Sequence, residues 1–160
     1  MKLFKFFFLT ITMLFSYDAI SLDLTITQGT IKPTPIAISN FYSQNDSMSK
    51  IGKNMAIVIS DNLERSGLFL PIDQKAFIQS SESLSKAPRF EDWKIIKSQH
   101  LVSGKINKTQ NKISVEFRLY DIFSQKELLA KKYETSEKNW RRVSHIISDA
   151  VFARITGDSG

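Results

Sequence analysis

Residues 113–120 have the sequence ISVEFRLY, in which apolar and polar side chains alternate over eight positions. This period of two is typical of a β-strand with one buried face. The apolar face would carry Ile113, Val115, Phe117 and Leu119, and the polar face Ser114, Glu116, Arg118 and Tyr120. It is the clearest strand pattern in the chain, and it predicts a sheet that packs against a core.

Strand patterns also flank this stretch on both sides. Residues 101–106 precede it across a polar turn at 107–112, and residues 126–133 follow a second turn at 121–125. Connections this short join antiparallel neighbours, so we expect a three-strand meander. Gly104 interrupts the first strand, which predicts either a bulge or a close approach of another backbone segment.

Two long helices are expected, one before the meander and one after it. The first starts at Asn45, stops at Ser66-Gly67 and carries an apolar stripe formed by Met48, Ile51, Met55, Val58, Ile59 and Leu63. The second starts near Ser136, ends at Gly157 and has an apolar face formed by Trp140, Val143, Ile147, Ala150, Val151 and Ile155. Each apolar stripe requires a sheet to cover.

Shorter elements complete the expected order. Pro35 opens a central strand at 36–38, Pro71 closes a short strand at 68–70, and 90–100 forms a helix with Trp93 and Ile96 on its inner side. Residues 74–89 are expected to be the least structured part. The fold class is therefore α/β, with a mixed sheet of about five strands packed against two to three helices. The first two strands should be parallel and joined by a right-handed crossover.

Residues 1–21 have the pattern of a secretory signal peptide. Lys2 and Lys5 precede a nearly continuous apolar run at 6–15, and small residues stand at Ala19 and Ser21. The run is too short to span a membrane, because a span needs about 20 apolar residues. We predict cleavage between Ser21 and Leu22, and a product in the periplasm that is not inserted in a membrane.

The segment that follows the cleavage site also has the pattern of a strand. Leu22, Leu24 and Ile26 alternate with Asp23, Thr25 and Thr27 as far as Gln28 and Gly29, and residues 30–34, with Pro33, form a link. Two interpretations follow from the alternation alone. The segment is either an edge strand of its own sheet or a free strand that adds to the sheet of another protein.

Composition excludes several classes of function. The 160 residues suit one domain, and the absence of cysteine excludes disulfides, thiolate metal sites and cysteine nucleophiles. The formal charge of +6 falls to +5 without residues 1–21, and the lysines are scattered rather than clustered. A nucleic-acid-binding surface needs a concentrated basic stripe, so no nucleic-acid partner is expected.

No motif for catalysis, a cofactor or a metal ion is found. The two histidines are His100, at a helix-to-strand junction, and His145, on the polar side of the last helix with Asp149 four residues later. A metal site needs three or four ligands, so we interpret the second pair as solvated neighbours. Glu91 and Asp92 suit the positive end of a helix dipole. The protein is therefore expected not to be an enzyme.

Taken together, these residues resemble the amino-terminal domain of the TolB family. The similarity covers nearly all of the chain after residue 21. It rests on Leu22–Gly29, on Pro35-Ile36-Ala37-Ile38 with Phe41, on residues 61–69, on Trp93 with residues 101–106, on residues 117–121, and on residues 140–149 with Ile155-Thr156-Gly157.

The resemblance implies an α/β domain of the anticodon-binding-like type at residues 35–156. It also implies membership of the Tol-Pal system, which maintains the outer membrane and its invagination during cell division. In this family the first mature residues bind the carboxy-terminal domain of TolA. The resemblance therefore favours the docking interpretation, with partner-binding residues Leu22, Asp23, Leu24, Thr25, Ile26, Thr27, Gln28 and Gly29.

One part of the family pattern is missing. Family members continue into a six-bladed propeller that binds the lipoprotein Pal, whereas residues 157–160 cover only the start of a link to it. Pal binding is therefore not carried over to this chain. A single-domain protein, an engineered piece and a fragment of a disrupted gene all stay open. A periplasmic α/β adaptor that activates another envelope protein is the alternative function, and a secreted enzyme is less favoured.

Overall fold

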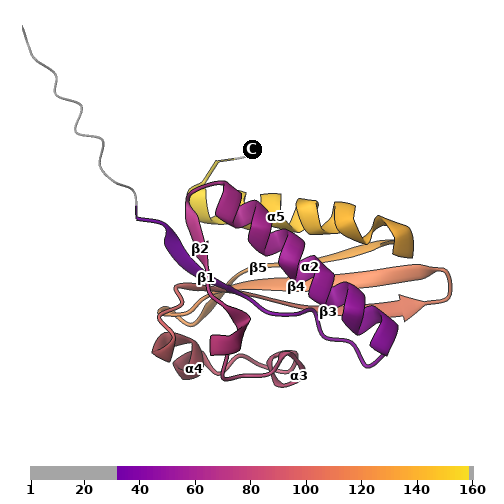
Figure 1. Ribbon diagram of the computed structural model, residues 1–160, viewed down its shortest axis with the longest axis horizontal. Coiled ribbons are helices and arrows are strands. Elements are labelled where there is room, and N and C mark those ends of the chain that lie inside the picture. Colours follow the sequence, from indigo (N-terminus) through magenta and orange to yellow (C-terminus); the bar gives the residue numbers. More distant parts are fainter. Residues whose placement is uncertain (1–31, 159–160) are drawn as a thin grey trace, which may run out of the picture. The chain divides into compact units, whose positions relative to one another are not determined.

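Residues 32–158 are described by a computed structural model, and they form one five-stranded sheet with helices on both faces (Figure 1). The strands are β1 (Thr34–Ile38), β2 (Phe69–Pro71), β3 (His100–Thr109), β4 (Lys112–Asp121) and β5 (Lys126–Ser136). The helices are α2 (Asp46–Arg65), α3 (Ser81–Leu84), α4 (Phe90–Ile95) and α5 (Trp140–Thr156). Two short 3-10 helices, η2 (Gln74–Ala76) and η3 (Glu137–Asn139), connect them.

The sheet is mixed, as predicted. Its strand order is β2-β1-β3-β4-β5, with β1 parallel to both β2 and β3. The β3, β4 and β5 strands form the expected antiparallel meander. Thr34, which we had placed in the link, is the first residue of β1.

Both ends of α2 and the carboxy-terminal end of α5 lie where their sequence signals are. The Asn45 side chain caps α2 by accepting a 3.2 Å hydrogen bond from the amide of Met48. Ser66 caps the other end, and Gly67 follows it with a left-handed φ of +73°. The α5 helix ends at Gly157, which has a φ of +81°.

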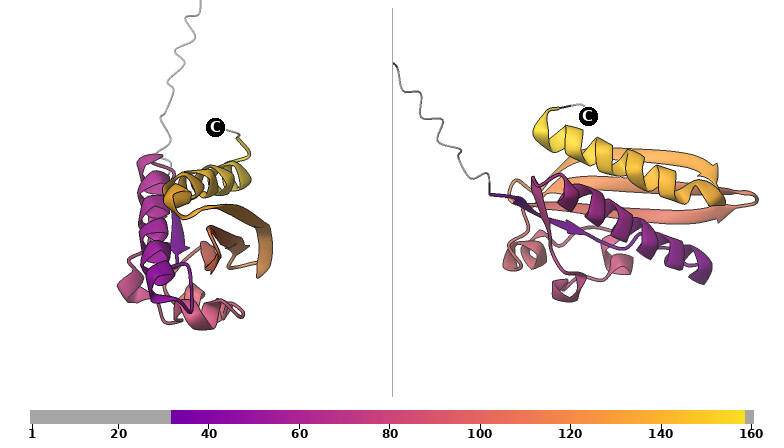
Figure 2. Two further views of the ribbon diagram at one scale, coloured as in Figure 1. Left: turned by 90° about the vertical axis from the view of Figure 1, so that its right-hand side faces the viewer. Right: turned by 45° about the horizontal axis from the view of Figure 1, so that its top comes forward.

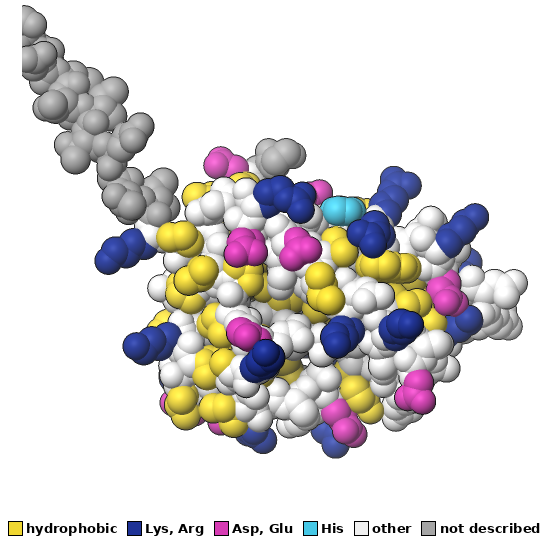
Figure 3. Space-filling model, viewed as in Figure 1, with side chains coloured by type: hydrophobic (Ala, Val, Ile, Leu, Met, Phe, Trp, Pro, Cys, Tyr) yellow, Lys and Arg dark blue, Asp and Glu magenta, His cyan; other side chains and the backbone are white. Residues whose placement is uncertain are grey.

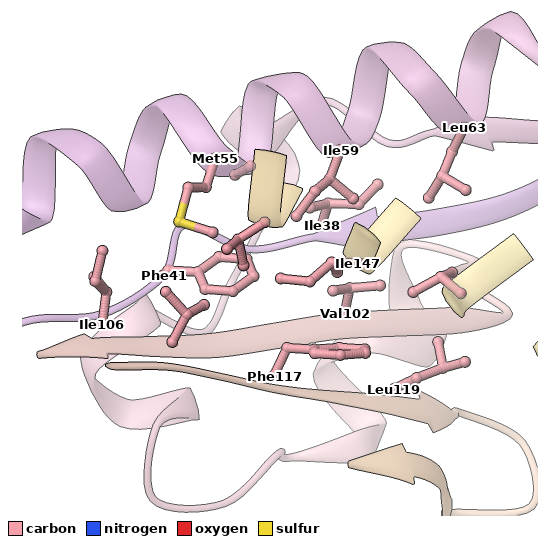
Figure 4. Packing of buried hydrophobic residues seen from close by; sticks show 14 of the residues in the cluster. Ile38, Phe41, Met55, Ile59, Leu63, Val102, Ile106, Phe117, Leu119 and Ile147 are labelled. Atoms are coloured by element: carbon pink, nitrogen blue, oxygen red, sulfur yellow. The ribbon is translucent and has the colours of Figure 1, made fainter. Parts of the chain in front are cut away.

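The main core lies between one face of the sheet and the paired helices α2 and α5 (Figure 2). Figure 4 shows Met55, Ile59 and Leu63 of α2 pointing toward Val102 of β3 and toward Phe117 and Leu119 of β4. The predicted helix stripes supply seven buried residues to this core: Met48, Met55, Ile59, Leu63, Val143, Ile147 and Val151. Trp140 is only partly buried at its border, where the Arg141 guanidinium lies 4.9 Å from the ring centroid.

Phe41 fits into this core because two glycines leave room for it. A Cβ atom added to Gly104 would collide with the Phe41 ring, and one added to Gly52 would collide with the Phe41 carbonyl oxygen. The backbone approaches here as well, since the Tyr42 amide donates to the Gly104 carbonyl at 2.9 Å, which confirms the predicted close approach. Gly52 was not predicted, although it lies on the buried face of α2.

A second, smaller core covers the opposite face of the sheet. It joins Ala37, Leu101, Tyr120 and Ile122 to Leu84 of α3 and to Trp93 of α4. Neighbouring residues on the strands point to opposite faces, so Ala37 lies in this core while Ile36 and Ile38 lie in the main one. Trp93 is fully buried and Ile96 packs beside it, as predicted. The predicted helix at 90–100 is shorter in the structure, because α4 ends at Ile95 and β3 already begins at His100.

Residues 74–89 are more ordered than we predicted. They contain η2 and α3, and buried Gln79 holds the segment together. Its amide nitrogen donates to the Ala87 carbonyl at 2.8 Å, and its oxygen accepts from the Arg89 amide at 2.9 Å and from the Trp93 indole at 3.1 Å. One polar side chain therefore satisfies three buried or half-buried groups.

The meander is also longer than we predicted. Register pairing continues to Thr109 and Lys112, so the first turn is only Gln110 and Asn111. The β5 strand continues through Ser136, where we expected the last helix to start, and α5 begins at Trp140 after η3. The polar residues at these ends pair through their backbones beyond the apolar core.

Candidate functional site

The predicted docking residues, Leu22 to Gly29, and the predicted cleavage site between Ser21 and Leu22 lie outside the described residues. The structure begins just after them, at exposed Lys32 and Pro33, which lead directly into β1. Two described features bear on the docking segment: β1, the strand that follows it in the chain, and the two edges of the sheet.

The anchor strand β1 lies inside the sheet, and neighbours hydrogen-bond to it on both sides. On the β2 side, the Thr34 amide donates to Leu68 at 2.8 Å and the Ile36 carbonyl accepts from Ile72 at 2.9 Å. On the β3 side, Pro35 accepts from Gln99 at 3.0 Å, and the Ser39 amide just after the strand donates to Val102 at 2.9 Å. No interior position in the sheet of residues 34–136 is left for another strand.

The two sheet edges differ in length, and each has features that disfavour strand addition. The β2 edge has three residues and ends at Pro71, which has no amide hydrogen to donate. Short edge strands and prolines commonly prevent edge-to-edge pairing.

The β5 edge is much longer, at 11 residues, and three features disfavour the addition of another strand to it. Lys131 lies opposite Phe117 in register, so an exposed lysine occupies the core-facing side of the strand. The pairing shifts between Leu119 and Tyr120, which leaves Leu128 as an extra residue on β5. The carbonyl of Leu128 accepts a 2.9 Å hydrogen bond from the Arg154 side chain of α5. Inward-pointing charges and bulges are known protections of sheet edges.

His145 has a different partner from the one we predicted. Its Nδ1 atom lies 2.8 Å from the Asn62 amide nitrogen, which also donates to Ser148 Oγ at 3.1 Å. An amide nitrogen only donates, so His145 Nδ1 is the acceptor. The interpretation as a solvated pair with Asp149 was therefore incomplete, because His145 links α5 to α2.

His100 lies at the start of β3, and its Nδ1 atom is buried without a hydrogen-bond partner among the described residues. Burial lowers the pKa of this imidazole below its usual 6.5, and nearby Asp121 opposes the shift. The pKa of Asp121 is lowered chiefly by a hydrogen bond from the Ser124 amide. His100 and Asp121 lie opposite each other in register, at the open end of the β3–β4 hairpin.

Other charged groups form surface pairs. Glu91 and Asp92 lie in the first turn of α4, as predicted, and pair with Lys94 at 2.8 Å and Arg89 at 2.6 Å. On the face shown in Figure 3, Lys and Arg side chains are dispersed among Asp and Glu rather than gathered in one patch. Within residues 32–158, no three His, Cys, Asp or Glu side chains are grouped to hold a metal ion.

Among the helices of the described region, none combines the length and apolar character needed to cross a membrane.

The sequence profile of the TolB amino-terminal domain family matches residues 22–128. The chain belongs to this family. It is 41% identical over 148 residues to the Tol-Pal system protein TolB of Pelagibacter ubique, covering 87% of this chain and 33% of that protein. It is 46% identical over 138 residues to TolB of Paramagnetospirillum magneticum, covering 86% of this chain and 31% of that protein. The chain thus spans about a third of the length of these TolB relatives.

Solved structures agree with the fold of the TolB amino-terminal domain. The crystal structure of TolB from Acinetobacter baumannii superposes with a TM-score of 0.67 at 24% identity, over 81% of this chain and 30% of that one. The lipoprotein GNA1162 from Neisseria meningitidis superposes with a TM-score of 0.53 at 16% identity, over 78% of this chain and 98% of that one. At these identities the likeness concerns the fold alone.

Proposed function

We propose that this TolB-family chain is a periplasmic, non-enzymatic component of the Tol-Pal system that acts in outer-membrane integrity and invagination during cell division. Its residues Leu22 to Gly29 dock onto the carboxy-terminal domain of TolA by β-strand addition. The observation that carries the proposal is the family match, which begins at residue 22, where a strand-like segment follows the predicted cleavage site.

The sheet geometry supports an external partner for the segment. Strand addition requires a free sheet edge, because an added strand bonds along its backbone. In this domain β1 already has a neighbour on each side, β2 is three residues long, and β5 carries Lys131 and the Arg154 contact. A segment that finds no favourable edge in its own domain is available to a neighbour.

Export is part of the proposed mechanism. The strand has a free amino terminus only after cleavage between Ser21 and Leu22. Mass spectrometry of the protein recovered from the periplasm should therefore find a chain that begins at Leu22. A mature chain that began beyond Ile26 would remove the strand and contradict the docking role.

Binding to the TolA carboxy-terminal domain tests the docking step directly. We expect residues 22–160 to bind and residues 30–160 not to bind in isothermal titration calorimetry. Both forms retain every described element, so their unfolding transitions should match. Equal affinity of the two forms would contradict the proposal.

A proline scan distinguishes strand addition from other modes of binding. In an added strand, alternate amides face the partner, so only every second proline removes an intermolecular hydrogen bond. Ile26→Pro should abolish binding if its amide faces TolA, and Thr25→Pro and Thr27→Pro should then weaken it much less. Strand addition would also be supported if Thr25→Pro and Thr27→Pro abolished binding and Ile26→Pro did not. Losses of affinity that do not alternate along the segment would contradict it.

A further inference from the structure

The part of the sheet that α3 and α4 leave uncovered contains a small hollow. It lies between the end of α3 and the adjoining strands β3 and β4, and its volume is about 150 Å³. This corresponds to roughly five water molecules at about 30 Å³ each, the size of a small organic ion. The lining side chains used below are Lys86, Ser103, Lys105, Glu116, Arg118 and Tyr120.

Two lining residues are polar and buried. Ser103 is 6% exposed and Tyr120 is 9% exposed. No hydrogen bond from the Ser103 hydroxyl is found within residues 32–158, and its oxygen is not fully enclosed, so the hydroxyl is open to the hollow. The hollow therefore presents a free hydrogen-bonding group at its floor.

The charged groups around the hollow are mostly positive. Lys86 comes from the chain after α3, Lys105 from β3 and Arg118 from β4, against one carboxylate, Glu116, whose Oε1 lies 3.9 Å from Lys132 Nζ. Arg118 is already bonded to Glu127 at 2.8 Å. Neither Lys86 nor Lys105 makes an ion pair with any described residue, so both ammonium groups are available to a ligand.

We propose that this hollow binds a small acidic compound through its carboxylate, as an acidic amino acid would bind. Lys86 and Lys105 approach the carboxylate from two different elements, and the Ser103 hydroxyl donates from the floor. Glu116 accepts from the ammonium group of the amino acid and disfavours a multiply charged phosphate. The site lies wholly within the domain and is independent of the docking segment.

The test is a titration of 15N-labelled residues 22–160 with L-glutamate at constant ionic strength. We expect saturable shifts of the amides of Ser85, Gly104 and Lys105. Lys86→Met and Lys105→Met should each weaken binding by up to about fivefold, as for a partly exposed ion pair of about 1 kcal/mol. Lys53→Met removes the same charge from α2, on the other face of the sheet, and should leave the affinity unchanged.

Three results would overturn the proposal. Shifts that grow linearly without saturation would show that no defined site exists. If Lys53→Met lost as much affinity as Lys86→Met and Lys105→Met, glutamate would be attracted only by the net charge of the protein. Tighter binding of inorganic phosphate than of glutamate would contradict the assignment of a carboxylate site.

Discussion

The ring of Phe41 lies against Gly104, so that a side chain at Gly104 would occupy the same space as the ring. The Glu116 carbonyl oxygen closes the space from the neighbouring strand, at 2.8 Å from the position of an added Cβ. Phe41 is thus held between α2 and β3, and the glycine is required by packing rather than by backbone conformation.

We therefore expect Gly104→Ala to lower the free energy of unfolding by about 1–3 kcal/mol, the usual cost of overpacking a core. Urea unfolding followed by circular dichroism measures this change. The double variant Phe41→Leu with Gly104→Ala should lose less than the sum of the two single changes, because the smaller side chain relieves the collision. Additive losses would show that the ring is not the obstacle.

Replacement of Gln79 by alanine should destabilise the segment around α3 and α4. The change leaves the buried Trp93 indole and the Arg89 amide without their acceptor, at a cost of about 1–3 kcal/mol. Hydrogen exchange of the Arg89 amide and of the Trp93 indole N–H should accelerate. Gln99→Ala replaces an exposed glutamine and should change neither the free energy of unfolding nor these exchange rates.

Stability should decrease as the pH falls below about 6.5. Burial in the folded protein holds the pKa of His100 below its usual 6.5, so the unfolded chain takes up a proton first and unfolding becomes easier. His100→Gln should remove this part of the dependence, and His145→Gln should retain it. Unfolding free energies measured between pH 8 and pH 5 compare the three proteins. An unchanged slope in His100→Gln would contradict the assignment.

A second loss should appear at lower pH. The folded protein holds the pKa of Asp121 below 3.8, so its stabilising contribution is complete above that value and is lost as the pH falls through the folded pKa. Ser124→Pro, which removes the amide that donates to Asp121, should reduce this loss.

Lys131→Val should make the protein associate with itself. The change replaces the charge on the core-facing side of β5 by an apolar, β-branched side chain opposite Phe117, which makes the edge suitable for pairing. Sedimentation equilibrium should show concentration-dependent dimers or larger species. Lys138→Val makes the same chemical change in η3, outside the sheet, and should stay monomeric. If the association uses residues 22–29 of a second copy, it should vanish in the form 30–160.

Patterns that depend on local sequence predicted the fold well. The alternation at 113–120 indicated β4, and Asn45, Gly67 and Gly157 indicated helix ends, because strand faces and helix caps are set by near neighbours. The role of Gln79 depends on partners up to 14 residues away that only the folded chain brings together. A polar segment rich in serine carries no local sign of such contacts.

The candidate site was predictable in part for the same reason. The alternation at Leu22 to Gly29 predicts a strand and stays a prediction, whereas the state of the sheet edges cannot be read from the sequence. Lys131 looks like an ordinary surface lysine until the register places it opposite Phe117. The link between Asn62 and His145 likewise joins residues 83 positions apart, so neither sequence context pointed to the other.

The interior position of β1 has a mechanical consequence. A load applied along the strand through Lys32 would shear the hydrogen bonds to β2 and β3 together instead of peeling them apart one at a time. Resistance of this kind is high because many bonds must break at once. A partner that pulled on the amino-terminal end of this domain would therefore transmit the force to β1, β2 and β3 together before the domain unfolded.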